Sequence, residues 1–412
     1  MTEGPSDLPP GWRWTTIGEA CFLNPRRPIL ERKMDAPTSF IPMNAVDEST
    51  GTIKSIETRP YQEVRSGYTY FEEGDVLFAK ITPCMQNGKS AIARRLIDGI
   101  GFGSTEFHVL RPKPGCLSEW VWYFIRQKSF RDAAQKAFRG GVGQQRVPPA
   151  FLANYPLPLP PLEEQRRIVA KLNEVMAQIQ EAKRLRAEAR KDAELLMQSA
   201  LAEVFPHSSS TLPPGWRWTR LGEIANTYSG SPAPQGDEYF KDGKWPFVRV
   251  QDLGRHGQTA CLKETADYVN EHALKRYRLR SARAGTILFP KSGAAILTNT
   301  RAILGVNAYI VSHLAAVEPI HEILDNKWAY FWLCTLDMKD FIENPSYPSL
   351  RLSVIRKLPV PLPPLEEQRR IVAHLEEIQE GINILKEAQV VSGQELKHLE
   401  TSILDKAFRG KL

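Results

Sequence analysis

Residues 158–170 read PLPPLEEQRRIVA, and the same letters return unchanged at residues 361–373. A second run, LPPGWRWT, stands at residues 8–15 and returns at residues 212–219. Identities of this length at a nearly constant offset indicate an internal duplication. The interiors between the runs are hardly alike, whereas a recent duplication without function would have left them similar. Each half therefore consists of a shared opening, a diverged body, a proline-rich joint and a shared tail.

The shared tails are predicted to be long helices. A proline pair precedes each tail, where a helix tolerates proline, and an acidic pair follows at the positive end of the helix dipole. Residues 163–205 contain neither Gly nor Pro, and residues 366–408 contain only Gly381 and Gly393 as weak points. A helix of this length forms a rod of roughly 60 Å.

Apolar residues recur along both tails at heptad spacing, which is typical of a coiled coil. The expected seam consists of Ile168, Leu172, Val175, Ile179, Ala182, Ala189, Ala193, Leu196 and Ala200 in the first tail, and of Ile371, Leu375, Ile378, Ile382, Leu385, Leu396, Leu399 and Ile403 in the second. Polar residues interrupt it at Arg186, Gln389 and Ser392, where they would specify register. Because a globular body separates the tails, we expect an intramolecular antiparallel pair; the alternative is two separate helices, each packed on its own body.

The bodies are predicted to be mixed α+β. Residues 75–80 (DVLFAK) and 286–291 (TILFPK) are β-rich and follow a glycine, whereas residues 120–138 and 328–342 have the pattern of helices with large aromatic faces. We interpret these aromatics as core and not as a platform for stacking bases. The expected fold is thus two pseudo-symmetric α+β bodies joined by two long antiparallel helices. The order of segments closes it like a ring, with the end of the second tail near the first LPPGWRWT and the termini close together.

Composition excludes several classes of protein. Of 412 residues 42% are hydrophobic and 25% charged, which is ordinary globular usage. The net charge of +7 is compatible with a polyanionic partner. Five cysteines without a CxxC pair disfavour a disulfide framework or a zinc ribbon. Without a signal peptide or an apolar run long enough to span a membrane, the chain is expected to be soluble and cytoplasmic, with no membrane partner.

Fragments that resemble catalytic motifs each lack a required part. Residues 88–90 (GKS) end like a phosphate-binding loop, but Pro83 stands where that loop needs a glycine. Residues 344–347 (NPSY) lack the second proline of the amino-methyltransferase motif, and no cofactor-binding βαβ unit precedes them. An Asp-Asp-Lys set within residues 237–244 resembles a nuclease cluster only faintly. The histidines show no metal-ligand spacing. We therefore expect no catalytic residue and no metal.

Basic and amide side chains gather in both bodies. Arginine and amide groups read base edges, whereas lysines and backbone N–H groups hold phosphates. A solvated charged face explains any single cluster equally well, but one cluster in each body favours nucleic acid. The candidate DNA-binding residues are Lys80, Gln86, Asn87, Lys89, Gln144, Gln145 and Arg146 in the first body, and Lys275, Arg276, Arg278, Lys291 and Arg351 in the second.

The nearly identical joints predict two equal docking sites for two copies of one partner, because pseudo-symmetric surfaces bind identical subunits symmetrically. The candidate docking residues are Glu163, Glu164, Gln165 and Arg166 in the first joint, and Glu366, Glu367, Gln368 and Arg369 in the second.

Over essentially its full length the chain resembles the specificity subunits of type I restriction–modification enzymes. The resemblance lies in LPPGWRWT, in the run GDVLFAKI at residues 74–81, in the duplicated PLPPLEEQRRIVA and in the ending FRGKL at residues 408–412. It implies two target-recognition domains, at residues 1–160 and 208–363. It also implies two spacer helices, at residues 161–207 and 364–412.

The resemblance further implies how such a chain works. Each domain would read one part of a split, asymmetric sequence in double-stranded DNA, and the helices would set the gap. The chain would bind no cofactor and catalyse nothing. Two methyltransferase subunits would supply S-adenosylmethionine-dependent adenine methylation, and two motor-nuclease subunits using ATP and Mg could join them. Two other functions stay open: a coiled-coil scaffold without DNA specificity, and an autonomous DNA methyltransferase.

Overall fold

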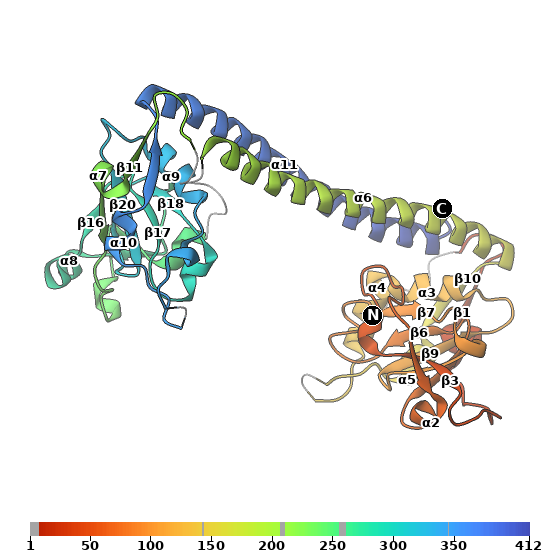
Figure 1. The fold of residues 1–412 in the computed structure, drawn as a ribbon. Coiled ribbons are helices and arrows are strands. Elements are labelled where there is room, and N and C mark those ends of the chain that lie inside the picture. The colour runs from red at the N-terminus through yellow and green to blue at the C-terminus, as the bar shows by residue number, and fades with distance from the viewer. Residues whose placement is uncertain (1–7, 142–143, 207–210, 255–260, 345) are drawn as a thin grey trace. The chain divides into compact units, whose positions relative to one another are not determined.

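The protein, seen here in a computed structural model, divides into two compact units. Unit 1 comprises Met1–Ala187 and Gln389–Leu412, and unit 2 comprises Glu188–Ala388. The residues described are 8–141, 144–206, 211–254, 261–344 and 346–412. Each unit holds one globular body and a part of each long helix, α6 (Leu162–Val204) and α11 (Leu365–Phe408). The bodies run from red to yellow and from green to blue in Figure 1.

The body of unit 1 contains two four-stranded sheets and one two-stranded ribbon. The first sheet, in spatial order, is β2 (Cys21–Leu23), β9 (Phe107–Pro112), β6 (Val76–Ala79) and β7 (Ser90–Ile92). The second is β4 (Glu57–Pro60), β3 (Pro37–Ile41), β8 (Ile100–Gly103) and β5 (Thr69–Glu72). The ribbon pairs β1 (Arg13–Thr16) with β10 (Pro156–Leu159), so that the opening run lies antiparallel to the joint.

Helices cover these sheets. They are α1 (Ile17–Ala20), α2 (Tyr61–Val64), α3 (Ser118–Arg126), α4 (Lys128–Lys136) and α5 (Pro149–Asn154), with the 3₁₀ turns η1 (Met43–Ala45) and η2 (Ile97–Gly99). The amphipathic face of α3 buries Trp120, Val121 and Phe124. Of the aromatics on this helix, Trp120, Tyr123 and Phe124 are core, as expected, because the helical period brings them to one face, whereas Trp122 is only partly buried.

Unit 2 has a body of the same plan. Its first sheet is β12 (Ala225–Ser229), β20 (Leu314–Pro319), β17 (Ile287–Pro290), β18 (Ala302–Leu304) and β14 (Cys261–Leu262). Its second is β15 (Asp267–Val269), β13 (Trp245–Val248), β19 (Ala308–Ile310) and β16 (Ser281–Ala282), and its ribbon pairs β11 (Arg217–Arg220) with β21 (Pro359–Leu362). Its helices are α7 (Leu221–Ile224), α8 (Glu271–Tyr277), α9 (Asn326–Cys334) and α10 (Leu352–Arg356). Its 3₁₀ turns are η3 (Asp237–Tyr239), η4 (Val250–Gly254), η5 (Ala294–Thr298) and η6 (Met338–Phe341).

The two bodies match strand for strand, although their sequences hardly do. In each, the second sheet contains one parallel pair among antiparallel ones, β3 with β8 and β13 with β19. Unit 2 adds one edge strand, β14, parallel to β18. The expected pseudo-symmetric α+β duplication is therefore confirmed.

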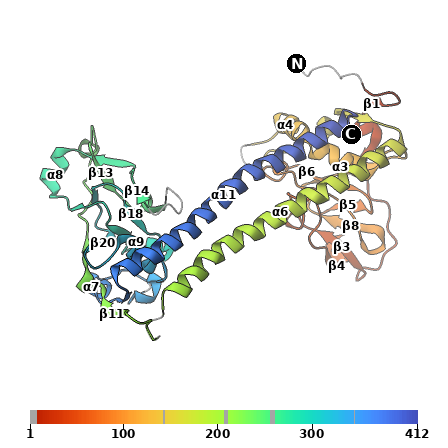
Figure 2. The ribbon, with the colours of Figure 1, turned by 90° about the horizontal axis from the view of Figure 1, so that it is seen from above.

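Within unit 1 the two long helices run antiparallel. Arg167 on α6 donates to the carbonyl of Leu412 at 2.6 Å, and further along α6 Lys183 pairs with Glu400 at 2.7 Å. Arg186, further still, donates to the carbonyl of Gln389. The partners of α6 therefore come earlier in the second tail as α6 proceeds. Figure 2 shows the two helices running in opposite directions. The antiparallel pair is the arrangement that the sequence predicts.

One tryptophan stack anchors the helices in each unit. In unit 1 Trp120 is fully buried, with the ring of Trp12 at 5.6 Å and the ring of Phe408, from the end of α11, at 4.4 Å. In unit 2 Trp328 is fully buried between Trp216 at 5.4 Å and Phe205, which follows α6, at 4.6 Å. The body of unit 1 therefore packs against the end of α11, which starts at the second joint, and the body of unit 2 packs against the end of α6, which starts at the first joint.

The second tail ends beside the first opening run, as expected. The ring of Pro9 lies so close to Gly410 that a Cβ there would sit 2.2 Å from it. Residues 1–7 lie outside the described part of the chain. The prediction that the two termini lie close together therefore stays a prediction for the N-terminus.

Part of the expected heptad seam is wrong. Leu196, Leu385 and Leu399 are exposed by 54%, 38% and 46%, whereas Leu201 and Leu404 are buried against the bodies. An α-helix has 3.6 residues per turn, so a strict 3.5-residue seam drifts around a straight helix over several heptads. The rest of the prediction holds in part, because the seam residues Ile168, Leu172, Ile179, Ala193, Leu375 and Ile382 are buried. No helix in the described residues is long and apolar enough to cross a membrane.

Candidate nucleic-acid interface

In unit 1 the chain that leaves β6 lies against the chain that leads into α5. The carbonyl of Lys80 accepts a hydrogen bond from the N–H of Val147 at 2.9 Å, and Thr82 donates to the carbonyl of Gln145 at 3.0 Å. Ile81 forms an isolated β-bridge with Arg146. The structure therefore brings Lys80 together with Gln145 and Arg146, which lie far from it in the sequence.

Unit 2 repeats this junction with other side chains. The carbonyl of Lys291, which follows β17, accepts from the N–H of Leu350 at 2.8 Å, and Ser292 bridges to Ser349. The exposed Arg351 comes next, immediately before α10. Lys80 and Lys291 are thus structural equivalents, and both stand where a core strand of the first sheet ends. A loop pair at a strand end places side chains on a rigid support, which suits recognition.

The charges at the two junctions are handled differently. In unit 1 the guanidinium of Arg146 binds both carboxylate oxygens of Glu106 at 2.8 Å, and this pairing lowers the pKa of Glu106. In unit 2 the equivalent strand start carries His313, whose ring accepts or donates at 2.6 Å to Ser292, while Arg351 pairs with Glu343 at 3.1 Å. Neither arginine is a free cation, so each would have to exchange its carboxylate for a base or phosphate.

The loop after β6 carries the other candidates of the first body away from this junction. Asn87 donates to Glu48 at 3.2 Å, and the ammonium of Lys89 donates to the carbonyl of Met43 at 3.3 Å. Gln86 lies beside α4, where its carbonyl accepts from Arg131 at 3.2 Å. These three residues therefore form a second group, separate from Lys80 and Arg146. Gln144 is exposed at the edge of residues 142–143, which are outside the described part.

The basic run of the second body lies on α8, next to the second sheet. Lys275 and Arg276 are exposed, and Lys275 pairs with Glu271 one turn earlier at 2.7 Å. Arg278 ends the helix in the left-handed conformation with φ of 47°. The structure does not bring this cluster together with Lys291 and Arg351, so the candidates of unit 2 also form two groups.

The joints contain one clear correction. Gln165 and Gln368 are completely buried, so the prediction that their side chains dock a partner is wrong. The carboxamide of Gln165 accepts from the N–H of Leu117 at 2.9 Å and donates to the carbonyls of Gly115 and Pro160. Gln368 makes the same three bonds, to Asp325, Ile323 and Pro363. The glutamine locks the start of each long helix to the start of α3 or α9.

The remaining joint residues lie outward. Glu163, Arg166, Glu366 and Arg369 are exposed, and Glu164 and Glu367 are half-buried. Glu163 pairs with Arg166, and Glu164 binds Arg167 through both oxygens at 2.7 and 2.8 Å. Glu367 and Arg370 repeat the second pair. The two joints thus present equal charged surfaces, and their role in docking stays a prediction.

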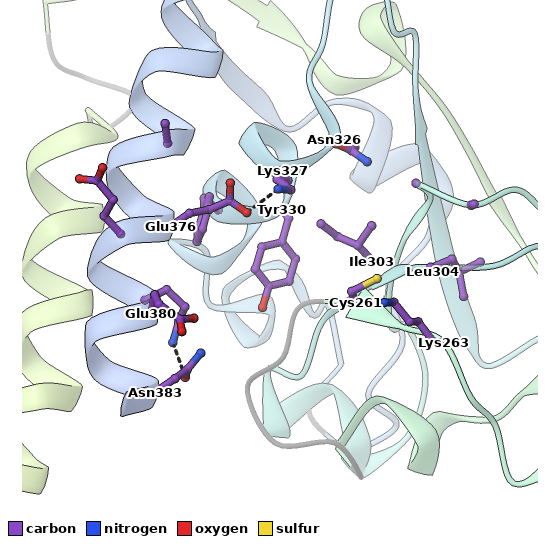
Figure 3. Close-up of a pocket in the computed structure, with 17 residues that line it drawn as sticks. Cys261, Lys263, Ile303, Leu304, Asn326, Lys327, Tyr330, Glu376, Glu380 and Asn383 are labelled. Carbon is purple, nitrogen blue, oxygen red and sulfur yellow. Dashed lines mark hydrogen bonds and ion pairs between the residues drawn. The ribbon is translucent and has the colours of Figure 1, made fainter. Parts of the chain in front are cut away.

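Unit 2 also contains a pocket of about 900 Å³ between the edge of its first sheet and α11 (Figure 3). Ile303 and Leu304 line one side, and Glu376, Glu380 and Asn383 line the helix side. Lys327 and Glu376 form an ion pair at 2.5 Å in it. Tyr330 points into the pocket, and burial raises its pKa. Among the described residues, no three side chains that could bind a metal ion gather in one place.

The sequence did not point to a third group of cations, on α3, α4 and α6. Arg126, Arg131 and Arg186 converge on one pocket of unit 1. In the sequence, Arg186 stood out only as an interruption of the apolar seam. The glycine opposite it, Gly393, was the signal that could have been used, because a helix keeps an interior glycine where another group comes close.

Comparisons with known proteins agree with this architecture. The family model described as "Type I restriction modification DNA specificity domain" matches residues 9–190 and again residues 213–390. The type I restriction enzyme EcoAI specificity subunit of Escherichia coli is 36% identical over 176 residues, which are 42% of this chain and 30% of that protein. The MjaIX specificity subunit of Methanocaldococcus jannaschii is 28% identical over 83% of this chain and 78% of its own length.

Solved structures match over the whole chain. A chain from a study of complex assembly and conformational transition of the type I R-M system has a TM-score of 0.81 and 33% identity, covering 99% of this chain and 100% of that one. The HsdS subunit from Thermoanaerobacter tengcongensis has a TM-score of 0.64 and 34% identity, with both chains covered completely. The match to the EcoAI subunit, in contrast, spans less than a third of that protein.

Proposed function

Because the chain belongs to the family of type I restriction–modification specificity subunits, we propose that it reads a split DNA sequence, one part with each body, and holds partner subunits at its two joints. One observation carries this proposal. The two bodies share their strand order and their anchoring to the long helices, yet the equivalent junctions after β6 and β17 present different side chains. A conserved plan with varied loops suits two related tasks on different sequences.

The different junctions favour an asymmetric target. Each junction has a lysine and an arginine that is paired with a carboxylate, Lys80 with Arg146 at the first and Lys291 with Arg351 at the second. The second junction differs in adding the Ser292 hydroxyl and the His313 imidazole, which are hydrogen-bonded to each other. Donors and acceptors of different kinds select different base edges in the major groove. A palindrome would require equal side chains at both junctions.

The equal outer surfaces of the joints favour two copies of one partner. In this proposal the partner is a methyltransferase subunit, and each joint holds one copy. In this proposal the chain itself is not an enzyme and holds no cofactor. S-adenosylmethionine would bind to the methyltransferase subunits, and ATP and Mg to any motor-nuclease subunits that join.

Mapping methylated adenines tests the proposal. The chain is co-expressed with its methyltransferase partner, and methylation is mapped across the host genome. We expect one motif with two unlike parts and a fixed gap. A continuous motif, or none, contradicts the proposal. Methyl transfer by the purified chain alone would favour the second candidate, an autonomous methyltransferase.

Docking is tested by reversing charge at the joints. Arg166→Glu and Arg369→Glu together should weaken assembly with the methyltransferase subunit at least about tenfold, since each change places like charges against a complementary surface. Sedimentation of the mixed subunits measures assembly, and Arg190→Glu, on α6 but outside both joints, is the matched control. Unchanged assembly of the double variant contradicts the assignment of the joints.

A further inference from the structure

The basic pocket of unit 1 is a cavity of about 640 Å³ between α3, α4 and the paired long helices. Its cations are Arg126, Lys128, Arg131, Lys183, Arg186 and Lys397. Its acids are Glu48, Asp132 and Glu400. Two of them form ion pairs with lysines: Asp132 with Lys128 at 2.5 Å and Glu400 with Lys183 at 2.7 Å. The pocket therefore has a surplus of positive charge that comes from its arginines.

The three arginines donate hydrogen bonds to backbone carbonyls and form no ion pair with a carboxylate among the described residues. Arg126 donates to the carbonyl of Ser49 at 2.9 Å, Arg131 to that of Gln86 at 3.2 Å, and Arg186 to that of Gln389. Among the described residues, no ion pair joins any of them to an acid. The Nε atoms of Arg131 and Arg186 are buried without a hydrogen-bond partner in this part of the chain. Burial lowers the pKa of Arg126; the charge of Glu400 opposes this effect, and the charge of Arg131 adds to it.

Each of these guanidinium groups lies against a glycine. A Cβ at Gly51 would meet Arg126 at 2.3 Å, one at Gly88 would meet Arg131 at 2.8 Å, and one at Gly393 would meet Arg186 at 2.7 Å. The chain thus leaves room for three large cations at one place, although gathering like charges out of water is unfavourable. Such an arrangement is explained when a ligand supplies the missing negative charge.

Unit 2 provides an internal comparison. Its equivalent pocket, about 570 Å³ between α9, the turn after β17 and the same two helices, contains only Glu194, Arg301 and Lys386 as charged residues. Six positions after the buried tryptophan, unit 1 has Arg126 and unit 2 has Cys334, and each lines the pocket of its unit. The fold therefore does not require the arginines.

We propose that the basic pocket of unit 1 binds a small anion that carries phosphate groups. A guanidinium group binds two oxygens of a phosphate at once, and three such groups around one cavity match a multivalent anion. The volume lies within the range of about 300 to 1,000 Å³ that small-molecule sites occupy. This site is independent of sequence recognition by the junctions after β6 and β17.

Calorimetric titration of the full chain with pyrophosphate, at constant ionic strength, tests the site. We expect one binding event, weakened about tenfold or more by Arg131→Gln and by Arg186→Gln, since a charge-assisted hydrogen bond is worth about that factor. Arg184→Gln removes the same charge two positions from Arg186, on the opposite face of α6, and should change affinity less than about twofold. Absence of binding by the parent chain, or parent-like binding by both pocket variants, overturns the proposal.

Two further variants keep the test valid if a glutamine variant does not fold. Arg131→Lys keeps the positive charge but removes the paired N–H donors of the guanidinium group. Gly393→Ala displaces the guanidinium group of Arg186 without removing it. Both variants should bind pyrophosphate more weakly. Addition of a short DNA duplex then distinguishes the source of the phosphate. Displacement of pyrophosphate by the duplex assigns the site to a backbone phosphate, and no displacement assigns it to a free anion.

Discussion

The two bodies have hardly similar sequences between the repeated runs, yet they agree at the places where they contact the long helices. Both bury one tryptophan against the opening run and against a phenylalanine from the far end of a long helix. Both use one buried glutamine to fix the start of the near helix. The comparison teaches that the plan of each unit depends on contacts in the repeated segments, which leaves the loops free to vary.

The tryptophan stacks should give the largest effect. We expect Trp120→Ala and Trp328→Ala each to cost about 3 to 5 kcal/mol in the stability of the unit concerned, because each deletes a fully buried aromatic side chain. Hydrogen exchange of α3 and α9 measures the two units separately. Equal loss of protection in both units after either change would contradict their independence.

A conservative change at the same place sharpens the comparison. Trp120 donates from Nε1 to the carbonyl of Pro158 at 3.0 Å, whereas Nε1 of Trp328 has no partner among the described residues. Trp120→Phe should therefore cost about 1 kcal/mol more than Trp328→Phe, the usual net worth of one hydrogen bond. The same exchange measurement decides this, and equal costs would contradict it.

The buried glutamines come next in size. Gln165→Ala and Gln368→Ala should each destabilise their unit by about 1 to 3 kcal/mol, since each leaves a buried N–H and two carbonyls unpaired. Thermal unfolding measures the loss. Arg166→Ala, one position along and exposed, is the control and should change stability by less than about 0.5 kcal/mol. If the control is as costly as Gln165→Ala, the burial argument fails.

The junction lysines should have a smaller effect, confined to DNA. In the assembled complex, Lys80→Ala and Lys291→Ala should each reduce the salt dependence of DNA binding by about one ion, because each removes one phosphate contact in the proposed function. Binding measured at several salt concentrations gives this slope. Lys136→Ala, exposed on α4, should leave the slope unchanged, and an unchanged slope for both junction lysines would exclude them as phosphate contacts.

Much of the fold could be predicted because the repeated segments of the sequence indicate it. The proline-rich joint, the glycine-free tail and the repeated opening run predict the helices and their antiparallel closure. Leu196 and Leu399 were predicted to lie in the buried seam and are exposed, because a heptad pattern cannot tell which helix face meets a folded body. Domain limits at residues 160 and 208 stay predictions, since each helix belongs to both units.

The candidate site was less predictable. Composition indicates which side chains could bind DNA, but it does not give their neighbours, and Arg146 is paired with Glu106 forty residues away in the sequence. Gln165 looked like part of a polar surface because the two residues before it and the two after it are all charged, yet its side chain is buried. The basic pocket is lined by residues of α3, α4, α6 and α11, whose meeting no local sequence pattern encodes.

The smallest expected effect is on stability at low pH, and it depends on an aspartate that accepts hydrogen bonds in a turn of each body. The ion pair with Lys339 and the hydrogen bond from Asn299 at 2.9 Å lower the pKa of Asp337 from the usual 3.8 to about 2. In unit 1, Lys54 and the Ser49 hydroxyl lower the pKa of Asp47 in the same way. A carboxyl group with a lowered pKa contributes stability that is present above its pKa in the unfolded state and is lost as pH falls through its pKa in the folded state.

We therefore expect Asp337→Asn to lower the melting temperature of unit 2 slightly at pH 6, with the difference shrinking as pH falls from about 4 toward about 2. Thermal unfolding of the variant and the parent at each pH measures this, and a difference that is constant with pH would mean that Asp337 acts through its hydrogen bonds alone and not through its charge.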